Sequence, residues 1–159
     1  MTHLQTLKKE LARMLQWEEA HVGFATAVEN LPLNAVGHTV ASLPYTVWQL
    51  VEHLRIAQHD IVSFCLDDNY QERTWPDDYW PTEKAPVDQQ QWEKSLKQIQ
   101  QDRQRIIKVI LLEDTDLFKP IARGNGQHLF REAMLIADHE AYHTGQIVLI
   151  RKQLGNWDM

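Results

Sequence analysis

Residues 46–67 read TVWQLVEHLRIAQHDIVSFCLD, and their apolar side chains recur every three or four positions, as they do on one face of an α-helix. The stripe is formed by Val47, Leu50, Val51, Leu54, Ala57, Ile61 and Phe64. Thr46 and Gln49 have the spacing of a capping box, in which each side chain binds the backbone N–H of the other. The pattern therefore predicts a helix that begins after Thr46 and ends near Asp67.

Three more segments show the same helical periodicity. The first covers about residues 2–29, and Asn30-Leu31-Pro32 is expected to end it. Another begins after Asp88, whose side chain is a good N-terminal cap, and the last covers about residues 127–154, with Gly155 as a suitable stop. Strand signals are nearly absent, so the sequence predicts an all-α protein.

A long segment separates the second and third of these helices. Residues 69–87 read NYQERTWPDDYWPTEKAPV, and the three prolines forbid a regular helix there. A loop of this length is uncommon inside a compact domain unless it has a function. We therefore expect one domain over residues 1–159, folded as a four-helix bundle, in which this long connection allows helices two and three to be other than antiparallel neighbours.

The composition excludes several classes of protein. With 43% hydrophobic and 24% charged residues, the chain is an ordinary globular sequence rather than a disordered one. Its net charge of −6 argues against a nucleic-acid partner, and no run approaches the roughly 20 apolar residues of a membrane span. Cys65 is the only cysteine, and the first ten residues carry charges where a signal peptide needs an apolar run. We expect a cytoplasmic protein.

His139 and His143 are four residues apart, so that their side chains project from the same face of the fourth helix. That face is otherwise apolar: Leu129, Ala133, Ile136, Ile147, Ile150 and Leu154. Burying an imidazole without a partner costs on the order of a few kcal/mol. The pair therefore needs either a metal ion or hydrogen-bond acceptors.

A third metal ligand should come from another helix, and His53 is the best candidate because it lies at the edge of the apolar stripe of the second helix. His59 lies six residues further on and is expected to face solvent. The remaining histidines are predicted to be surface residues: His3, His21, His38 and His128.

The segment 139–143, HEAYH, matches the H-E-x-x-H pattern of zinc peptidases, in which the glutamate is the general base. These enzymes need a third ligand downstream, but no glutamate follows Glu140. The extended pattern requires a glycine and a histidine where this chain has Gln146 and Leu149. We therefore reject a peptidase and expect Glu140 to be solvated or to support a ligand.

Two segments, 44–54 (PYTVWQLVEHL) and 138–147 (DHEAYHTGQI), resemble the DinB family of helical-bundle metalloproteins. The resemblance implies that His53, His139 and His143 are the three ligands of one divalent metal ion, with zinc or nickel the usual ion. It also implies a four-helix bundle with a long crossover loop between helices two and three, which often forms a homodimer. Some members of the family are metal-dependent S-transferases of low-molecular-weight thiols such as bacillithiol, mycothiol or glutathione, and many others have no assigned activity.

Three imidazoles leave at least one position of a metal ion open, which is typical of catalytic sites. The first hypothesis is therefore a thiol S-transferase that acts on a small-molecule substrate. The second is a hydrolase that uses metal-bound hydroxide, with Glu140 or Asp60 as the weak candidates for proton acceptor. The third is a non-enzymatic metal-binding or interaction protein, which would have no substrate cavity.

Other residues bear on these hypotheses. The aromatic residues of the long loop are expected either to cover a pocket above the metal or to seal one end of the bundle: Trp75, Tyr79 and Trp80. Three arginines are candidates for binding the carboxylates of a thiol cofactor: Arg55, Arg123 and Arg151. Cys65 is expected to pack as a small apolar residue.

Overall fold

The computed structural model describes residues 2–16, 18–40 and 43–157, and all of its regular elements are helices. Four are long: α1 (His3–Met14), α4 (Val47–Leu66), α5 (Gln89–Leu111) and α6 (Leu129–Gln153). Two short helices, α2 (Phe24–Val28) and α3 (Leu33–Val36), and one 3-10 turn, η1 (Asp77–Tyr79), complete the set. The all-α prediction is thereby confirmed. No helix in the described part of the chain is long and apolar enough to cross a membrane.

The ends of the long helices follow from local hydrogen bonds. The predicted capping box at the start of α4 is present: the Gln49 N–H donates to Thr46 Oγ1 and the Thr46 N–H donates to Gln49 Oε1, both at 3.2 Å. Asp88 caps α5 by accepting from the Gln91 N–H at 2.7 Å. Helix α6 is followed by Gly155, whose φ of 69° is the left-handed conformation that suits glycine.

The prediction of a single helix over residues 2–29 is wrong. Helix α1 ends at Met14, and the chain forms a second, short helix only from Phe24. The apolar stripe of α1 continues to Leu15, but Glu18 and Glu19 occupy the next positions that would face the core. Ending the helix avoids the burial of those two carboxylates. Trp17, which falls within the helix predicted over residues 2–29, lies outside the described residues.

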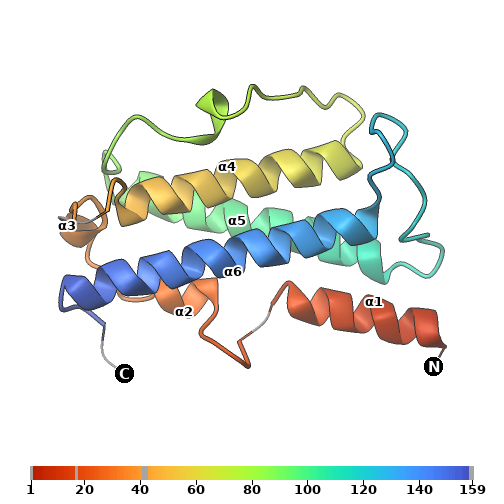
Figure 1. Cartoon of the computed structure of the whole chain (residues 1–159), viewed down its shortest axis with the longest axis horizontal. Helices are drawn as coiled ribbons and strands as arrows, with labels where there is room; N and C mark the ends of the chain where they lie inside the picture. Colours follow the sequence, from red (N-terminus) through yellow and green to blue (C-terminus); the bar gives the residue numbers. More distant parts are fainter. Residues whose placement is uncertain (1, 17, 41–42, 158–159) are drawn as a thin grey trace.

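The connection 67–88 returns along the outside of α4, so that α4 and α5 run in the same direction (Figure 1). Its last part is attached to the beginning of α4, since Thr46 Oγ1 donates to Lys84 O at 2.7 Å and Gln49 Nε2 donates to Pro81 O at 3.3 Å. α4 packs against both α5 and α6, and α1 packs against α5 and α6.

Two clusters of buried apolar side chains fill the interior. One joins the first half of α4 to α2, α3, the start of α5 and the end of α6; the other joins α1 to the end of α5 and the start of α6. Polar residues are buried between the two clusters, where the middle parts of α4, α5 and α6 meet: Gln58, Asp102, His143 and Thr144. Such groups require partners, so this polar layer is where a ligand site is expected.

Candidate metal centre

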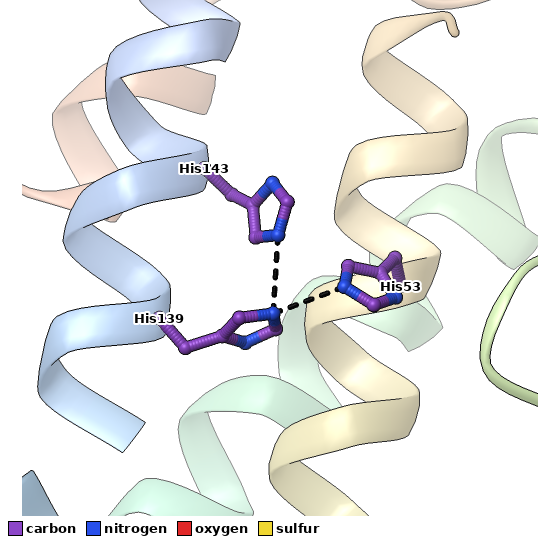
Figure 2. Close-up of side chains that lie close together, drawn as sticks. All are labelled: His53, His139 and His143. Carbon is purple, nitrogen blue, oxygen red and sulfur yellow. Dashed lines mark hydrogen bonds between the residues drawn. The ribbon is translucent and has the colours of Figure 1, made fainter. Parts of the chain in front are cut away.

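Three histidines from two helices meet in this polar layer. His53 lies on α4, whereas His139 and His143 lie one turn apart on α6, and the three side chains point toward one another (Figure 2). The Nε2 atom of His139 is 3.0 Å from Nε2 of His53 and 3.1 Å from Nε2 of His143. The possible ligand atoms of all three residues lie within 4.8 Å of one another. The structure therefore brings together the three histidines that the sequence singled out, and they could bind one metal ion.

Two of the imidazoles are held in a fixed tautomer. His53 Nδ1 lies 2.9 Å from the backbone oxygen of Tyr79, and His143 Nδ1 lies 2.6 Å from Gln146 Oε1. Because a carbonyl oxygen only accepts, both Nδ1 atoms carry the ring proton and both Nε2 atoms present a lone pair to the centre of the cluster. Gln146 is oriented in turn, since its Nε2 donates to the Tyr45 hydroxyl at 2.8 Å.

The count of ring protons favours a cation between the three rings. With Nδ1 of His53 and His143 protonated, only His139 can place a proton on Nε2, and one N–H donates to one nitrogen at a time. One of the two close N···N contacts would then join two lone pairs. A metal ion accepts all three lone pairs. For zinc, with Zn–N of about 2.0–2.1 Å, two tetrahedral ligand atoms lie about 3.3 Å apart, close to the two contacts of His139. The ligand atoms of His53 and His143 lie within 4.8 Å of each other.

All three imidazoles are neutral at neutral pH, which is the form that binds a metal. Burial lowers the pKa of His53 and of His143 below the ordinary value. Burial, with the neighbouring His143 and His53 adding to it, lowers the pKa of His139 to about 4. Little proton competition for the ligand atoms remains at pH 7.

The long connection covers the cluster from the side of α4. Trp80 stacks on the His53 ring with centroids 3.9 Å apart and planes at 5°, and Tyr45 stacks on Trp80 at 6.4 Å. The Tyr79 hydroxyl donates to Asp60 Oδ2 at 2.7 Å, about two turns along α4 from His53. These contacts hold the loop carbonyl in place against His53 Nδ1.

A cavity of about 450 Å³ opens beside the cluster and is lined by His53 and His139. His53 and His143 are buried, whereas His139 is partly exposed, so the accessible side of the centre is the side of His139. Trp75 and Tyr79 also line the cavity. The loop aromatics were expected either to cover a pocket or to seal one end of the bundle. Trp75 and Tyr79 line a pocket next to the cluster, as in the first of these roles. The volume suits a small organic molecule.

The two carboxylates considered as proton acceptors have different positions. Asp60 lines the cavity. Glu140 is instead ion-paired with Arg103 of α5, and it lines a separate cavity together with residues of α1 and α2. Burial raises the pKa of Glu140, while Arg103 opposes this effect. Glu140 follows His139 directly, and a step of one residue turns a side chain by about 100° around the helix. Although residues 139–143 match the H-E-x-x-H pattern, Glu140 therefore does not line the cavity beside the histidines.

Several expectations about single residues need correction. His59 does not face solvent freely, because its Nδ1 lies 2.8 Å from Oδ2 of the buried Asp102. His128 is partly exposed, and it caps α6 by accepting from the Arg131 N–H at 3.2 Å while its ring packs near Phe118 and Phe130. Cys65 packs on an apolar cluster as expected, and burial raises the pKa of its thiol to about 12.

None of the three arginines considered for a cofactor carboxylate lines the cavity. Arg55 pairs with Glu52, Arg123 donates to the backbone oxygen of Asp67, and Arg151 is buried against the backbone of Ala27. The cavity is lined by two other arginines that the sequence did not single out, Arg73 and Arg131. Both lie outside the histidine motifs, and neither spacing nor hydropathy distinguishes them.

No protein-family model matches the chain, and no curated protein or solved structure is significantly similar to it. The function must therefore be inferred from the residues of the site.

Proposed function

We propose that the chain is a metal-dependent enzyme built on a four-helix bundle, and that it transfers a low-molecular-weight thiol to an electrophilic small molecule. The observation that carries this proposal is the pair of Nε2···Nε2 contacts at 3.0 and 3.1 Å that share one available ring proton, beside an open cavity. The resemblance of residues 44–54 and 138–147 to the DinB family supports the choice of thiol transfer.

A zinc or nickel ion with three imidazole ligands and an open position lowers the pKa of a thiol or water molecule that binds to it. In the proposed reaction, the thiol sulfur attacks an electrophilic carbon of the substrate. A C–S bond forms while the bond to the leaving group breaks, and the leaving group takes that electron pair. Asp60 in the cavity wall is the chain's own group that can take up the thiol proton.

Hydrolysis is the second candidate, and the position of Asp60 favours it. Here the water oxygen attacks an electrophilic carbon of the substrate, and a C–O bond forms while the bond to the leaving group breaks and the leaving group takes that electron pair. Asp60 accepts the water proton, and the Tyr79 hydroxyl, 2.7 Å away, orients the carboxylate. A purely metal-binding protein is the weakest of the three hypotheses, because it has no use for a cavity of about 450 Å³ beside the histidines.

Metal content tests the first part of the proposal. Wild-type protein is purified beside His53→Ala and His59→Ala, and bound metals are measured by elemental analysis. We expect about one divalent ion per chain in wild type and in His59→Ala, and a loss of at least tenfold in affinity in His53→Ala. Equal metal content in the three proteins would reject the ligand assignment.

Activity tests the second part. The metal-loaded protein is mixed with 1-chloro-2,4-dinitrobenzene and either glutathione or cysteine, and in parallel with a p-nitrophenyl ester without thiol. Thiol-dependent arylation that is lost in His53→Ala supports S-transfer. Ester cleavage without thiol, lost in the same variant, favours hydrolysis. A protein that binds the metal but shows neither reaction would contradict both enzyme proposals.

A further inference from the structure

The wall of the cavity beside the three histidines contains charged side chains of both signs. Two arginines and three carboxylates line it. Arg131 and Glu132 form an ion pair with each other, and Asp60 already accepts the hydrogen bond of the Tyr79 hydroxyl. Glu72 is exposed to solvent. Most of the charged groups in the wall are therefore occupied or solvated.

Arg73 is the exception. Its side chain is partly buried, and within the described part of the chain it forms no hydrogen bond or ion pair. A guanidinium presents five N–H donors in a planar fork that matches a carboxylate, and the nitrogens of Arg73 are open to solvent, so that they are available to a ligand. A ligand that brings an anionic oxygen pair into the cavity would satisfy this group.

The same cavity has aromatic walls. Phe64 and Tyr70 pack edge to face with centroids 5.5 Å apart, and Trp75 and Tyr79 pack at 5.2 Å; all four line the cavity. Leu135 and Ile61 extend the apolar surface toward α6 and α4. Such walls suit a flat apolar body, because ring faces and edges pack favourably on one another.

We infer that the molecule bound in this cavity is a small carboxylate with a flat, apolar or aromatic body, whose carboxylate pairs with Arg73 while its reacting end reaches the three histidines. The assignment of the reacting end rests on the proposed function; the assignment of the carboxylate to Arg73 does not. The carboxylate can belong either to the thiol or to the electrophile that receives the thiol sulfur. Its pairing with Arg73 is the same in both cases.

Two matched pairs of probes test this inference on the full chain loaded with cobalt. The first pair is 4-mercaptophenylacetate and its amide, whose binding through sulfur is followed by the thiolate-to-cobalt charge-transfer absorption. The second pair is phenylacetate and phenylacetamide, measured by titration calorimetry. Wild type is compared with Arg73→Gln, Arg73→Lys and the control Arg105→Gln, whose arginine lies outside the cavity and pairs with Asp67 and Asp102.

We expect wild type to bind each carboxylate at least about tenfold more tightly than its amide, since a charge-assisted hydrogen-bonded pair is lost with the amide. The preference should fall to about twofold or less in Arg73→Gln, remain in large part in Arg73→Lys, and be unchanged in Arg105→Gln. A preference that survives in Arg73→Gln would place the carboxylate on the metal or elsewhere and overturn the inference. The inference would also be overturned if wild type bound acid and amide equally, or if it bound neither of them in the millimolar range.

The two probe pairs separate this inference from the proposed function. If 4-mercaptophenylacetate produces no charge-transfer band while phenylacetate keeps its Arg73-dependent preference, thiol activation at the metal is wrong and the carboxylate site stands. If the thiol probes bind the metal but acid and amide bind equally, the carboxylate site is wrong and the metal chemistry stands.

Discussion

The indole of Trp80 lies flat on the imidazole of His53, with centroids 3.9 Å apart and ring planes 5° from parallel. The preceding residue, Tyr79, accepts a hydrogen bond from Nδ1 of the same imidazole. The connection between α4 and α5 thus holds one candidate ligand both by its ring face and by its far nitrogen. This loop therefore supports the candidate metal centre, although none of the three candidate ligands belongs to it.

Removing the Trp80 indole should therefore weaken metal binding. Stacked ring pairs contribute about 0.5–1.5 kcal/mol, so Trp80→Ala should lower the metal affinity roughly three- to tenfold. Competition with a chromophoric chelator measures the affinity. Trp75→Ala is the matched control, because Trp75 is 69% exposed and is not stacked on a histidine. Equal losses in the two variants would show that the stacking on His53 is not what matters.

Gln146 should be almost as important to the centre as a ligand. Gln146→Leu removes the acceptor of the His143 Nδ1–H, and we expect the metal affinity to fall about tenfold or more. Gln146→Glu, which keeps an acceptor, should retain most of the affinity. The exposed Gln153 on the same helix provides the control Gln153→Leu. An unchanged affinity in Gln146→Leu would contradict the proposed orientation of His143.

The metal-free chain should lose stability in mild acid. The unfolded His139 takes up a proton near pH 6.5, whereas burial lowers its pKa in the folded chain to about 4. Between these values the unfolded state binds the additional proton, so stability is complete above pH 6.5 and is lost as the pH falls toward 4. The difference corresponds to about 3 kcal/mol.

Urea unfolding of chelator-treated protein at pH 7 and pH 4.5 measures this change. In His139→Gln the dependence on pH should be clearly smaller, although His53 and His143, whose pKa values are also lowered, contribute in the same direction. A free energy of unfolding that is the same at both pH values in wild type would exclude the effect.

Lys8 should be unusually important for stability among the lysines. It is buried, and its Nζ donates to the backbone oxygens of Leu112 and Glu113 at 2.6 and 3.0 Å, just beyond the end of α5. Lys8→Met leaves both acceptors without this donor, and we expect a loss of about 2 kcal/mol in the free energy of unfolding. The exposed neighbour gives the control Lys9→Met, which should change stability by less than about 0.5 kcal/mol.

The sequence predicted the long helices well wherever an apolar stripe and a cap coincide. Thr46 with Gln49, and Asp88 with Gln91, form the expected caps because these contacts depend only on residues three apart. The prediction was wrong after Leu15, where helix-forming residues continue but the apolar stripe does not. A propensity for helix was there outweighed by the cost of turning Glu18 and Glu19 toward the core.

The histidines were identified for the same reason. His139 and His143 interrupt an apolar face at helical spacing, and His53 lies at the edge of another. The groups around them could not be found in this way. A backbone oxygen of Tyr79, a stacked Trp80 and an Arg73 in the cavity wall all come from the irregular connection, whose path depends on tertiary contacts and has no periodic signal.

His53 and His139 are 86 positions apart in the chain, yet their Nε2 atoms lie 3.0 Å from each other. An ion bound between them is a reversible cross-link across more than half of the polypeptide. Its binding free energy adds to the stability of the folded state and is withdrawn when the ion leaves, since the unfolded chain holds no such site. If the three histidines bind such an ion, the lifetime of this protein against proteases would depend on the supply of metal in its surroundings.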